Sequence, residues 1–361
     1  MEKMNLKGQQ LLLNTVINQG LCVQCGACVG HCPYFNFFDG QVMAMDTCRS
    51  ETGRCIQLCP QVEHEKASSD RPLDIKSDIK SLEKPIGFFK EIFIARASKQ
   101  SIRNQAQYGG IVSSILAYAL NKDLVNFAVL TNRGSGIAPE GVIAESESDI
   151  FACAGSRYSS SASLSALNKA IHENKRKIAV VGLPCQMESL SRMKLMDQGK
   201  DSIGDRIALA IGLFCTWSIK YRELTQYLIH EGITSKIIKY DIPPPPSQLF
   251  MVQTHNGWKE LSLDRVRPYI HKGCSFCLDM TAELSDISVG TVEDKKGWNT
   301  VIIRSDAGME LMNMAISDSV IETQELPKKN LEHLKKAAGN KRKRGLAALK
   351  NKKMNNEYNN S

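Results

Sequence analysis

The spacing of the cysteines constrains this chain more than any other feature of its sequence. Twelve cysteines occur in 361 residues, and seven of them lie before residue 60. Four fall in a C-x2-C-x2-C-x3-C-P run, at Cys22, Cys25, Cys28 and Cys32. Three thiolates two residues apart can surround one face of a cubane cluster, whereas a zinc site rarely needs four cysteines so close together. The run therefore predicts iron–sulfur chemistry.

A second, less regular set follows the first. Cys48, Cys55 and Cys59 match the end of the same run, but Thr52 stands where a regular run has its middle cysteine. In bacterial two-cluster ferredoxins the fourth cysteine of a run binds the other cluster. That rule predicts two groups of ligands: Cys22, Cys25, Cys28 and Cys59 for a complete 4Fe–4S cluster, and Cys32, Cys48 and Cys55 for a second one.

Three thiolates leave the second cluster one ligand short. It would be a 3Fe–4S cluster, or a 4Fe–4S cluster whose fourth ligand is a residue such as Asp46 or His64, or it would be lost. We expect the module to hold two clusters, because the three remaining cysteines keep the positions of cluster ligands.

The bulk composition predicts a cytoplasmic protein. No apolar run approaches the ~20 residues that a membrane span needs, and the first residues lack the layout of a signal peptide. The cytoplasm keeps thiols reduced, so many cysteines there indicate metal rather than disulfides.

The net charge of +8 is concentrated near the end of the chain. Residues 328–353 contain eleven Lys or Arg and one acid, so the remainder carries a charge of about −2. We therefore expect a solvated helix with a frayed end, and no nucleic-acid partner. Docking of this basic segment onto an acidic partner subunit is the alternative.

Changes in residue composition along the chain predict four parts: a ferredoxin-like module at 1–66, a polar linker at 67–88, a larger domain at 89–326, and a basic helix and tail at 327–361. Apolar, β-rich segments of the larger domain predict strands at 91–97, 126–132, 177–182, 208–215, 236–242, 286–290 and 300–305. A helix is expected at 111–122, and Asn256-Gly257 indicates a hairpin. The expected fold class is α+β: a mixed α/β domain with an N-terminal two-cluster ferredoxin-like module.

Four more cysteines of the larger domain occur in distinctive positions. Cys185 and Cys215 each follow an apolar strand, and Cys274 and Cys277 form a C-x2-C pair in a later loop. Ends of neighbouring strands at one edge of a sheet commonly gather ligands, so these thiols could complete one site. Spacing alone leaves zinc and a 4Fe–4S cluster as comparable alternatives. Cys153 lies in an apolar segment and is expected to be a small buried hydrophobe.

Residues 91–345 resemble the β-subunit family of coenzyme F420 hydrogenases and dehydrogenases. The matching stretches are Tyr108-Gly109-Gly110-Ile-Val-Ser113, Ala154-Gly155-Ser156-Arg157-Tyr158, Gly182-Leu-Pro-Cys185-Gln186, Gly212-Leu-Phe-Cys215, Cys274-x2-Cys277-x-Asp279, Asp286-Ile-Ser-Val-Gly290 and Val301-Ile-Ile-Arg304. The resemblance implies that the four cysteines of the larger domain bind a 4Fe–4S cluster beside an FAD, and that the flavin exchanges hydride with coenzyme F420. Longer members, such as F420-linked formate dehydrogenase β subunits, carry an N-terminal ferredoxin module. The incomplete second cluster motif departs from that pattern.

The same resemblance implies a set of flavin-binding residues: Tyr108, Gly109, Gly110, Ser113, Gly155, Ser156, Arg157, Tyr158, Gly182 and Gln186. The glycine stretches at 109–110 and 155–161 precede expected helices, and a helix N-terminus offers free N–H groups and a positive dipole end to a pyrophosphate. The chain has no G-x-G-x-x-G, which disfavours a Rossmann dinucleotide site.

The sequence and the resemblance together predict an oxidoreductase subunit with two or three 4Fe–4S clusters and an FAD. Electrons would move between a hydride carrier, coenzyme F420, and a partner such as a hydrogenase, a formate dehydrogenase or a heterodisulfide-reductase-like enzyme. No catalytic side chain is expected, because the cofactors carry the chemistry. Two alternatives remain: a ferredoxin- or NAD(P)H-linked reductase of another organic substrate, and a non-catalytic relay subunit that holds clusters but no FAD.

Overall fold

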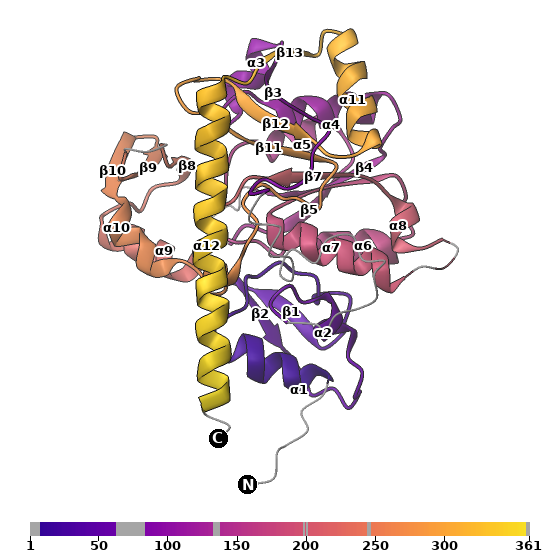
Figure 1. The fold of residues 1–361 in the computed structure, drawn as a ribbon, viewed down its shortest axis with the longest axis vertical. Helices are drawn as coiled ribbons and strands as arrows, with labels where there is room; N and C mark the ends of the chain where they lie inside the picture. Colours follow the sequence, from indigo (N-terminus) through magenta and orange to yellow (C-terminus); the bar gives the residue numbers. More distant parts are fainter. Residues whose placement is uncertain are drawn as a thin grey trace.

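The computed structural model describes residues 8–62, 84–132, 138–197, 199, 201–243 and 247–358. Figure 1 shows an N-terminal module at one end, a large sheet with helices on both faces, a small sheet at one side, and a long C-terminal helix. This helix runs from the large sheet toward the N-terminal module. The linker expected at 67–88 falls mostly outside the described residues, which resume at residue 84.

The N-terminal module is small and largely irregular. Its regular elements are α1 (Gly8–Leu12), the π-helix η1 (Leu13–Ile17), β1 (Phe35–Phe38), β2 (Gln41–Ala44) and α2 (Arg54–Leu58). β1 and β2 pair antiparallel through a loop of Asp39 and Gly40, whose φ angles of +47° and +80° suit the Asp-Gly type of tight turn. Buried apolar side chains such as Leu12, Phe35 and Val42 pack against several of the cysteines.

The large sheet contains eight strands in the order β13-β3-β12-β11-β7-β6-β4-β5. Their bounds are β3 (Glu91–Ala97), β4 (Phe127–Thr131), β5 (Gly141–Ala144), β6 (Ile178–Gly182), β7 (Ile207–Leu213), β11 (Ile287–Thr291), β12 (Asn299–Ile303) and β13 (Ile321–Glu325). The central strands β11, β7, β6 and β4 run parallel, and the outer strands pair antiparallel. This mixed sheet confirms the expected mixed α/β fold class.

The strands that were expected from apolar runs all form, and the expected helix is α4 (Ile111–Asn121). The hairpin differs by one residue: Thr254 pairs with Gly257, so the loop consists of His255 and Asn256. The hydroxyl of Thr254 accepts the Asn256 N–H at 3.1 Å, which closes the turn one residue earlier. Sequence reasoning missed β1, β2, β5 and β13, because these strands are short and β13 is mostly exposed and polar.

Helices cover the two faces of the large sheet. On one face lie α4, α5 (Glu147–Ala152) and α11 (Asp306–Ser317), and on the other lie α6 (Ser163–His172), α7 (Pro184–Met196) and α8 (Ile203–Arg206) (Figure 1). A short helix, α3 (Gln100–Gln105), follows β3. The first face buries side chains such as Ile115 and Leu311, and the second buries Leu167 and Met187. Burial on both faces explains why β6 is apolar along its full length.

The small sheet has the strand order β10-β9-β8 and a core of its own. It consists of β8 (Ile237–Asp241), β9 (Leu249–Thr254) and β10 (Gly257–Ser262), with α9 (Tyr221–His230) and α10 (Leu263–Val266) beside it. Leu228, Phe250 and Val252 are buried between these elements. Two 3-10 helices, η3 (Arg267–Tyr269) and η4 (Lys272–Phe276), lead from this unit back to the large sheet.

The N-terminal module shares a hydrophobic core with α6 and α7. Val23, Ala27 and Leu58 of the module belong to the same buried cluster as Leu167 and Met187. The side-chain amide of Asn168 in α6 donates to the carbonyl oxygens of Ala27 and Val29, at 3.0 and 2.7 Å. A Cβ atom on Gly26, whose φ is +84°, would lie 2.6 Å from the carbonyl oxygen of Ala162. The module is therefore fitted closely onto the larger domain.

The C-terminal helix α12 (Lys328–Tyr358) buries a polar stripe. Its buried positions are Ala338, Lys341, Arg342 and Gly345, spaced as i, i+3, i+4 and i+7 like the core-facing stripe of an amphipathic helix. A Cβ atom on Gly345 would lie 2.9 Å from the carbonyl oxygen of Cys277, so the glycine lets the helix approach that backbone. The expectation of a solvated helix is therefore wrong for this stretch, because two of its cations face the protein interior.

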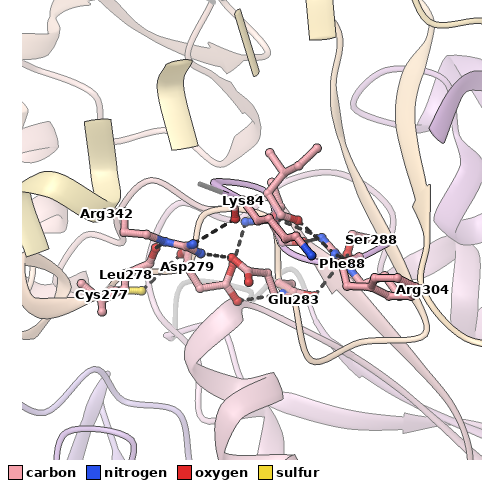
Figure 2. A network of polar contacts seen from close by, with 12 residues as sticks. Lys84, Phe88, Cys277, Leu278, Asp279, Glu283, Ser288, Arg304 and Arg342 are labelled. Carbon is pink, nitrogen blue, oxygen red and sulfur yellow. Dashed lines mark hydrogen bonds and ion pairs between the residues drawn. The ribbon is translucent and has the colours of Figure 1, made fainter. Parts of the chain in front are cut away.

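Arg342 forms a fully buried ion pair with Glu283 (Figure 2), and the two side chains are 1% and 3% exposed. The guanidinium also donates to the carbonyl oxygens of Lys84 and Leu278, at 3.0 and 3.3 Å. Burial, with help from the charge of Asp279, raises the pKa of Glu283 to about 8, although Arg342 opposes that rise. A buried acid in this setting depends on its cationic partner.

We expect Arg342→Ala to destabilise the protein by about 3–5 kcal/mol, because it leaves Glu283 buried without its partner. The control is Arg344→Ala on the same helix, where the side chain is exposed and the expected change is within about 0.5 kcal/mol. Thermal unfolding of the two variants beside the wild type measures the difference. Equal melting temperatures for the two variants would show that the pair does not anchor the helix.

Candidate iron–sulfur and flavin site

Five cysteines of the N-terminal module line one small apolar cavity. Four of them, Cys22, Cys25, Cys28 and Cys59, are the set that the two-cluster rule groups together, and the fifth is Cys55 of the other set. Burial raises the pKa of the Cys22 thiol, and Cys25 and Cys59 raise it further. Burial and the nearby Cys25 also raise the pKa of Cys59, to about 12. The structure therefore brings together the four cysteines that the two-cluster rule groups as one set.

The backbone around these cysteines offers hydrogen-bond donors to their sulfur atoms. The N–H of Gln24 points to Cys22, that of Ala27 to Cys25, and that of Gln61 to Cys59. Crowded, buried thiols resist ionisation, and the positive charge of bound iron is what stabilises them as thiolates. Four convergent sulfurs, a small cavity and N–H donors fit the requirements of a 4Fe–4S cluster.

Cys32, Cys48 and Cys55 form a second group. Burial raises the pKa of Cys55 to about 11, with contributions from Cys32 and Cys48. The buried side chain of Gln9 organises the loop that carries Cys48: its oxygen accepts the Cys48 N–H at 2.7 Å, and its amide donates to the Asp46 carbonyl at 2.8 Å. Sequence reasoning missed this glutamine because it lies far from any cysteine motif.

Of the two residues suggested as the fourth ligand of the second group, the structure describes only Asp46. Asp46 is exposed, and its carboxylate accepts the N–H of Thr47 at 2.7 Å. His64 lies outside the described residues. Thr52 is exposed in the turn before α2. The identity of a fourth ligand therefore stays a prediction.

The third group lies at one edge of the large sheet. β6 and β7 are parallel neighbours, and their ends lead into Cys185, at the start of α7, and into Cys215. Cys274 lies in η4 and Cys277 directly follows it. Burial raises the pKa of Cys215 to about 11 and that of Cys274 to about 12. Cys215, Cys274 and Cys277 each raise the pKa of Cys185, so the structure gathers the four thiols as neighbours.

Helix α7 connects the first and third groups. Cys185 opens the helix, and Ser189 and Arg192 follow on the same face at i+4 and i+7. The Ser189 hydroxyl lies 3.6 Å from the sulfur of Cys25, and Arg192 donates to the carbonyl oxygen of Cys59 at 2.6 Å. After burial, Cys25 is the largest influence that raises the pKa of Cys185. The two groups of thiols are therefore adjacent.

Within the described part of the chain, no group of three or more His, Cys, Asp or Glu side chains is close enough to hold a single metal ion. A cubane cluster makes a different demand, because each thiolate bonds a different iron and the sulfurs stand farther apart than around one zinc.

The loop that carries Cys274 and Cys277 is held by charged side chains (Figure 2). The carboxylate of Asp279 accepts the N–H groups of Thr281 and Glu283, both at 2.8 Å, which turns the chain just after Cys277. Arg304 donates to the carbonyl and hydroxyl oxygens of Thr281, at 3.3 and 3.0 Å. Asp279 and Arg304 belong to the sequence motifs, and the structure gives them this positioning role.

Lys341 reaches the same region from α12. The whole Lys341 residue is 3% exposed. Its ammonium group donates to the carbonyl oxygen of Cys215 at 2.7 Å. Burial lowers the pKa of Lys341, but Cys277, Cys215 and Asp279 raise it more, so the net shift is upward. Sequence reasoning missed Lys341 because it lies in a basic helix where every second or third residue is a cation.

The two glycine-containing stretches of the expected flavin site meet around Asp241 of β8. The Tyr108 hydroxyl and the Gln107 amide both donate to one oxygen of Asp241, at 3.0 and 2.9 Å. The oxygen of Gln107 accepts the Ser156 N–H at 3.4 Å. Burial and then the charge of Asp241 raise the pKa values of Tyr108 and Tyr158. Asp241 and Gln107 were not among the expected residues, since neither lies in a recognisable motif.

The glycines of these stretches differ in their surroundings. Gly110 is the N-cap of α4 at φ +77°, and Gly109 is packed so tightly that a Cβ would lie 2.7 Å from the side-chain oxygen of Asn299. Gly155 has more room, and its nearest neighbour at the Cβ position is the guanidinium of Arg157, at 3.6 Å. Ser113 is half-buried on α4.

The remaining expected residues lie beside Cys185. Gly182 is the last residue of β6. The side chain of Gln186 accepts the Leu183 N–H at 2.7 Å and donates to the Ser161 carbonyl at 3.0 Å, so it caps α7 and ties it to the segment after Tyr158.

Buried polar side chains occur where the glycine stretches approach the third group. Ser160 and His271 form a buried hydrogen bond of 2.7 Å, and burial, followed by the charge of Lys220, lowers the pKa of His271 to about 4. The hydroxyls of Ser163 and Ser218 are buried without a hydrogen-bond partner. An unpartnered buried hydroxyl is unfavourable, so these two groups fit a region that receives a polar ligand.

Across the described ranges, none of the helices combines the length and apolar character that a membrane span requires.

Comparison with known proteins identifies three matching segments. Residues 92–168 and 175–329 match the models for the N-terminal and C-terminal parts of the coenzyme F420 hydrogenase/dehydrogenase β subunit. Residues 15–35 match the model for a 4Fe–4S binding domain. The resemblance inferred from the motifs is confirmed.

Two relatives and one solved structure show the extent of the similarity. The coenzyme F420 hydrogenase subunit beta of Methanothermobacter thermautotrophicus is 31% identical, over 70% of this chain and 89% of its own length. The coenzyme F420-dependent sulfite reductase of Methanocaldococcus jannaschii is 31% identical over 96% of this chain, but the chain spans only 53% of that enzyme. A chain of the F420-reducing [NiFe] hydrogenase complex from Methanosarcina barkeri superimposes with a TM-score of 0.68 at 28% identity, covering 74% of this chain and 93% of that one.

We expect the second thiol group to form a centre that loses iron readily. Three thiolates should hold a fourth iron weakly, so mild oxidation of the wild type should give a 3Fe-type signal in electron paramagnetic resonance. Thr52→Cys should suppress that signal by supplying a fourth thiolate.

Thr47→Cys is the matched control, because it adds an exposed cysteine beside Cys48 without the ligand spacing. A wild type with full iron content and no 3Fe signal would mean that a fourth ligand is already in place, and Asp46→Ala would then be the next variant to examine.

Proposed function

This chain belongs to the coenzyme F420 hydrogenase/dehydrogenase β-subunit family, and we propose that it moves electrons between coenzyme F420 and a partner redox enzyme through an FAD and its 4Fe–4S clusters. The observation that carries the proposal is helix α7, which has a thiol of the third group in its first turn and contacts two residues of the first group on the same face. Such an arrangement suits an electron relay, because neighbouring clusters can exchange electrons without a conformational change.

Three groups of thiols support three cluster positions within the proposal. Cys185, Cys215, Cys274 and Cys277 would hold one 4Fe–4S cluster, and Cys22, Cys25, Cys28 and Cys59 another. Cys32, Cys48 and Cys55 would hold the third, with the incomplete ligand set described above. The proposed order of transfer runs from the larger domain to the first group, because Cys25 and Cys185 are neighbours.

The proposed flavin position is the region between Asp241 and the third thiol group. The Ile219 N–H donates to the Tyr158 carbonyl at 2.8 Å, and Gln186 bonds the Ser161 carbonyl, so the glycine stretch and the cysteine segments are directly linked. The buried hydroxyl of Ser218 is an available donor beside the third group, because the backbone of Ser218 lies at the sulfur of Cys274. Bound FAD would supply the exchange between two-electron hydride chemistry and one-electron transfer.

The residues of this chain would bind and orient the cofactors rather than react. Tyr108 and Tyr158 keep their protons because their pKa values are raised, so they would act as neutral hydrogen-bonding groups. His271 stays neutral at physiological pH, because burial lowers its pKa to about 4. No side chain is proposed as a catalytic acid or base.

Coenzyme F420 is proposed as the hydride carrier because the relatives that match most of the larger domain are named for it. The partner is proposed to be another redox subunit, such as a hydrogenase, a formate dehydrogenase or a heterodisulfide-reductase-like enzyme. The whole sulfite reductase activity is not proposed for this chain, which spans about half of that enzyme.

We expect Cys277→Ala to lose about four irons per chain, because a cluster with three thiolates in this group would not be retained. Cys153→Ala is the control and should keep the full iron content, since Cys153 lies outside the three groups. Iron analysis of the purified, folded variants measures the difference. An unchanged iron content in Cys277→Ala would remove this group from the cluster sites.

We expect the oxidised protein to show flavin absorption above the broad absorption of the clusters. Reduced coenzyme F420 should bleach this spectrum within seconds, and NADH at the same concentration should not. Bleaching by NADH alone would favour a reductase linked to NAD(P)H, and a spectrum without flavin peaks would favour a relay subunit that holds only clusters.

A further inference from the structure

The charges around Cys277 are not balanced within the protein. Arg304, Arg342 and Lys341 are buried together there, against two acids, Asp279 and Glu283. A buried charge in excess is strongly unfavourable unless an opposite charge lies beside it. The surplus among these described residues is at least one positive charge, and the ammonium group of Lys341 bonds the carbonyl oxygen of Cys215 at 2.7 Å.

The helix that carries Lys341 is shaped for this position. Lys341 and Arg342 occupy the buried stripe of α12, and Gly345 lets that stripe lie against the Cys277 backbone. Arg342 is engaged with Glu283, whereas the ammonium group of Lys341 bonds the Cys215 carbonyl at 2.7 Å. The geometry therefore brings one cation to the backbone of Cys215, on a helix that also lies against the backbone of Cys277.

We propose that Lys341 is a positioning residue whose fixed positive charge raises the reduction potential of the cluster held by Cys185, Cys215, Cys274 and Cys277. The inference rests on the proposed function, since it requires the cluster at this site. Reduction adds one electron and therefore one negative charge to the cluster. A nearby cation stabilises the reduced form more than the oxidised form, and the buried setting weakens solvent screening of that attraction.

The consequence concerns the direction in which electrons move. A raised potential makes this cluster an easier acceptor for electrons that enter the larger domain. Among the described residues, Arg192 is a cation beside the first group; it bonds the Cys59 carbonyl and pairs with Glu188 at 2.6 Å. The charge of Arg192 is thus largely compensated, whereas that of Lys341 acts on the cluster.

Three variants separate the charge of Lys341 from its hydrogen bond. Lys341→Gln keeps a donor for the Cys215 carbonyl but has no charge, and Lys341→Arg keeps both. Lys343→Gln is the matched control, because it removes a positive charge two residues away where the side chain is exposed. Cys277→Ala identifies which reduction step belongs to this cluster, since that step should disappear in it.

The measurement is a redox titration of the intact, iron-loaded chain followed by electron paramagnetic resonance. In Lys341→Gln the step that Cys277→Ala removes should become about tenfold harder to reduce, which is 59 mV for a one-electron couple. Lys341→Arg and Lys343→Gln should keep the potential of the wild type, and every variant except Cys277→Ala should keep its iron.

The inference is overturned if Lys341→Gln keeps its iron and its potential, or if Lys343→Gln shifts the potential equally. Lys341→Arg tests the same charge independently, so a lowered potential in that variant also overturns it, even if Lys341→Gln fails to assemble. A Cys277→Ala variant that retains every reduction step would contradict the proposed cluster site itself, which distinguishes failure of the proposed function from failure of this inference.

Discussion

The structure is organised around the cost of burying thiols that repel one another when they ionise. Cys22, Cys185 and Cys274 all have pKa values raised first by burial and then by other cysteines. Such groups need positive charge and hydrogen-bond donors around them. The fold supplies N–H groups of the tight turns in the N-terminal module, the N-terminus of α7 beside Cys185, and the cations of α12 at the third group. These features are explained together by a protein that holds clusters of thiolate-bound iron.

Close packing of the N-terminal module against α6 and α7 follows from the same requirement. A relay needs its clusters near one another, and a tethered module that moved freely would spend little time at the right distance. Asn168, Ser189 and Arg192 hold backbone or sulfur atoms of the module directly, and the two parts share one hydrophobic core. Residues 8–62 therefore pack directly against the larger domain.

Much of this architecture could be predicted from the sequence, because some patterns carry their own geometry. The C-x2-C spacing, the apolar strands and the position of Cys185 and Cys215 after two of those strands predicted thiols gathered at a sheet edge, where β6 and β7 are parallel neighbours. Other contacts are not marked by any recognisable sequence pattern. Gln9, Asp241 and Lys341 act through residues more than thirty positions away, and their local sequence resembles ordinary polar surface. The buried stripe of α12 was missed because lysine and arginine are normally read as solvent-exposed.

The position of α12 in the chain also bears on how the protein is made. Synthesis proceeds from the N-terminus, so every cysteine of the three groups leaves the ribosome before Lys341 and Arg342 do. Until that last helix packs, Glu283 lacks its cationic partner and the loop around Cys277 lacks one of its supports. The surroundings of the third thiol group are therefore completed by residues that are synthesised after all four of its cysteines.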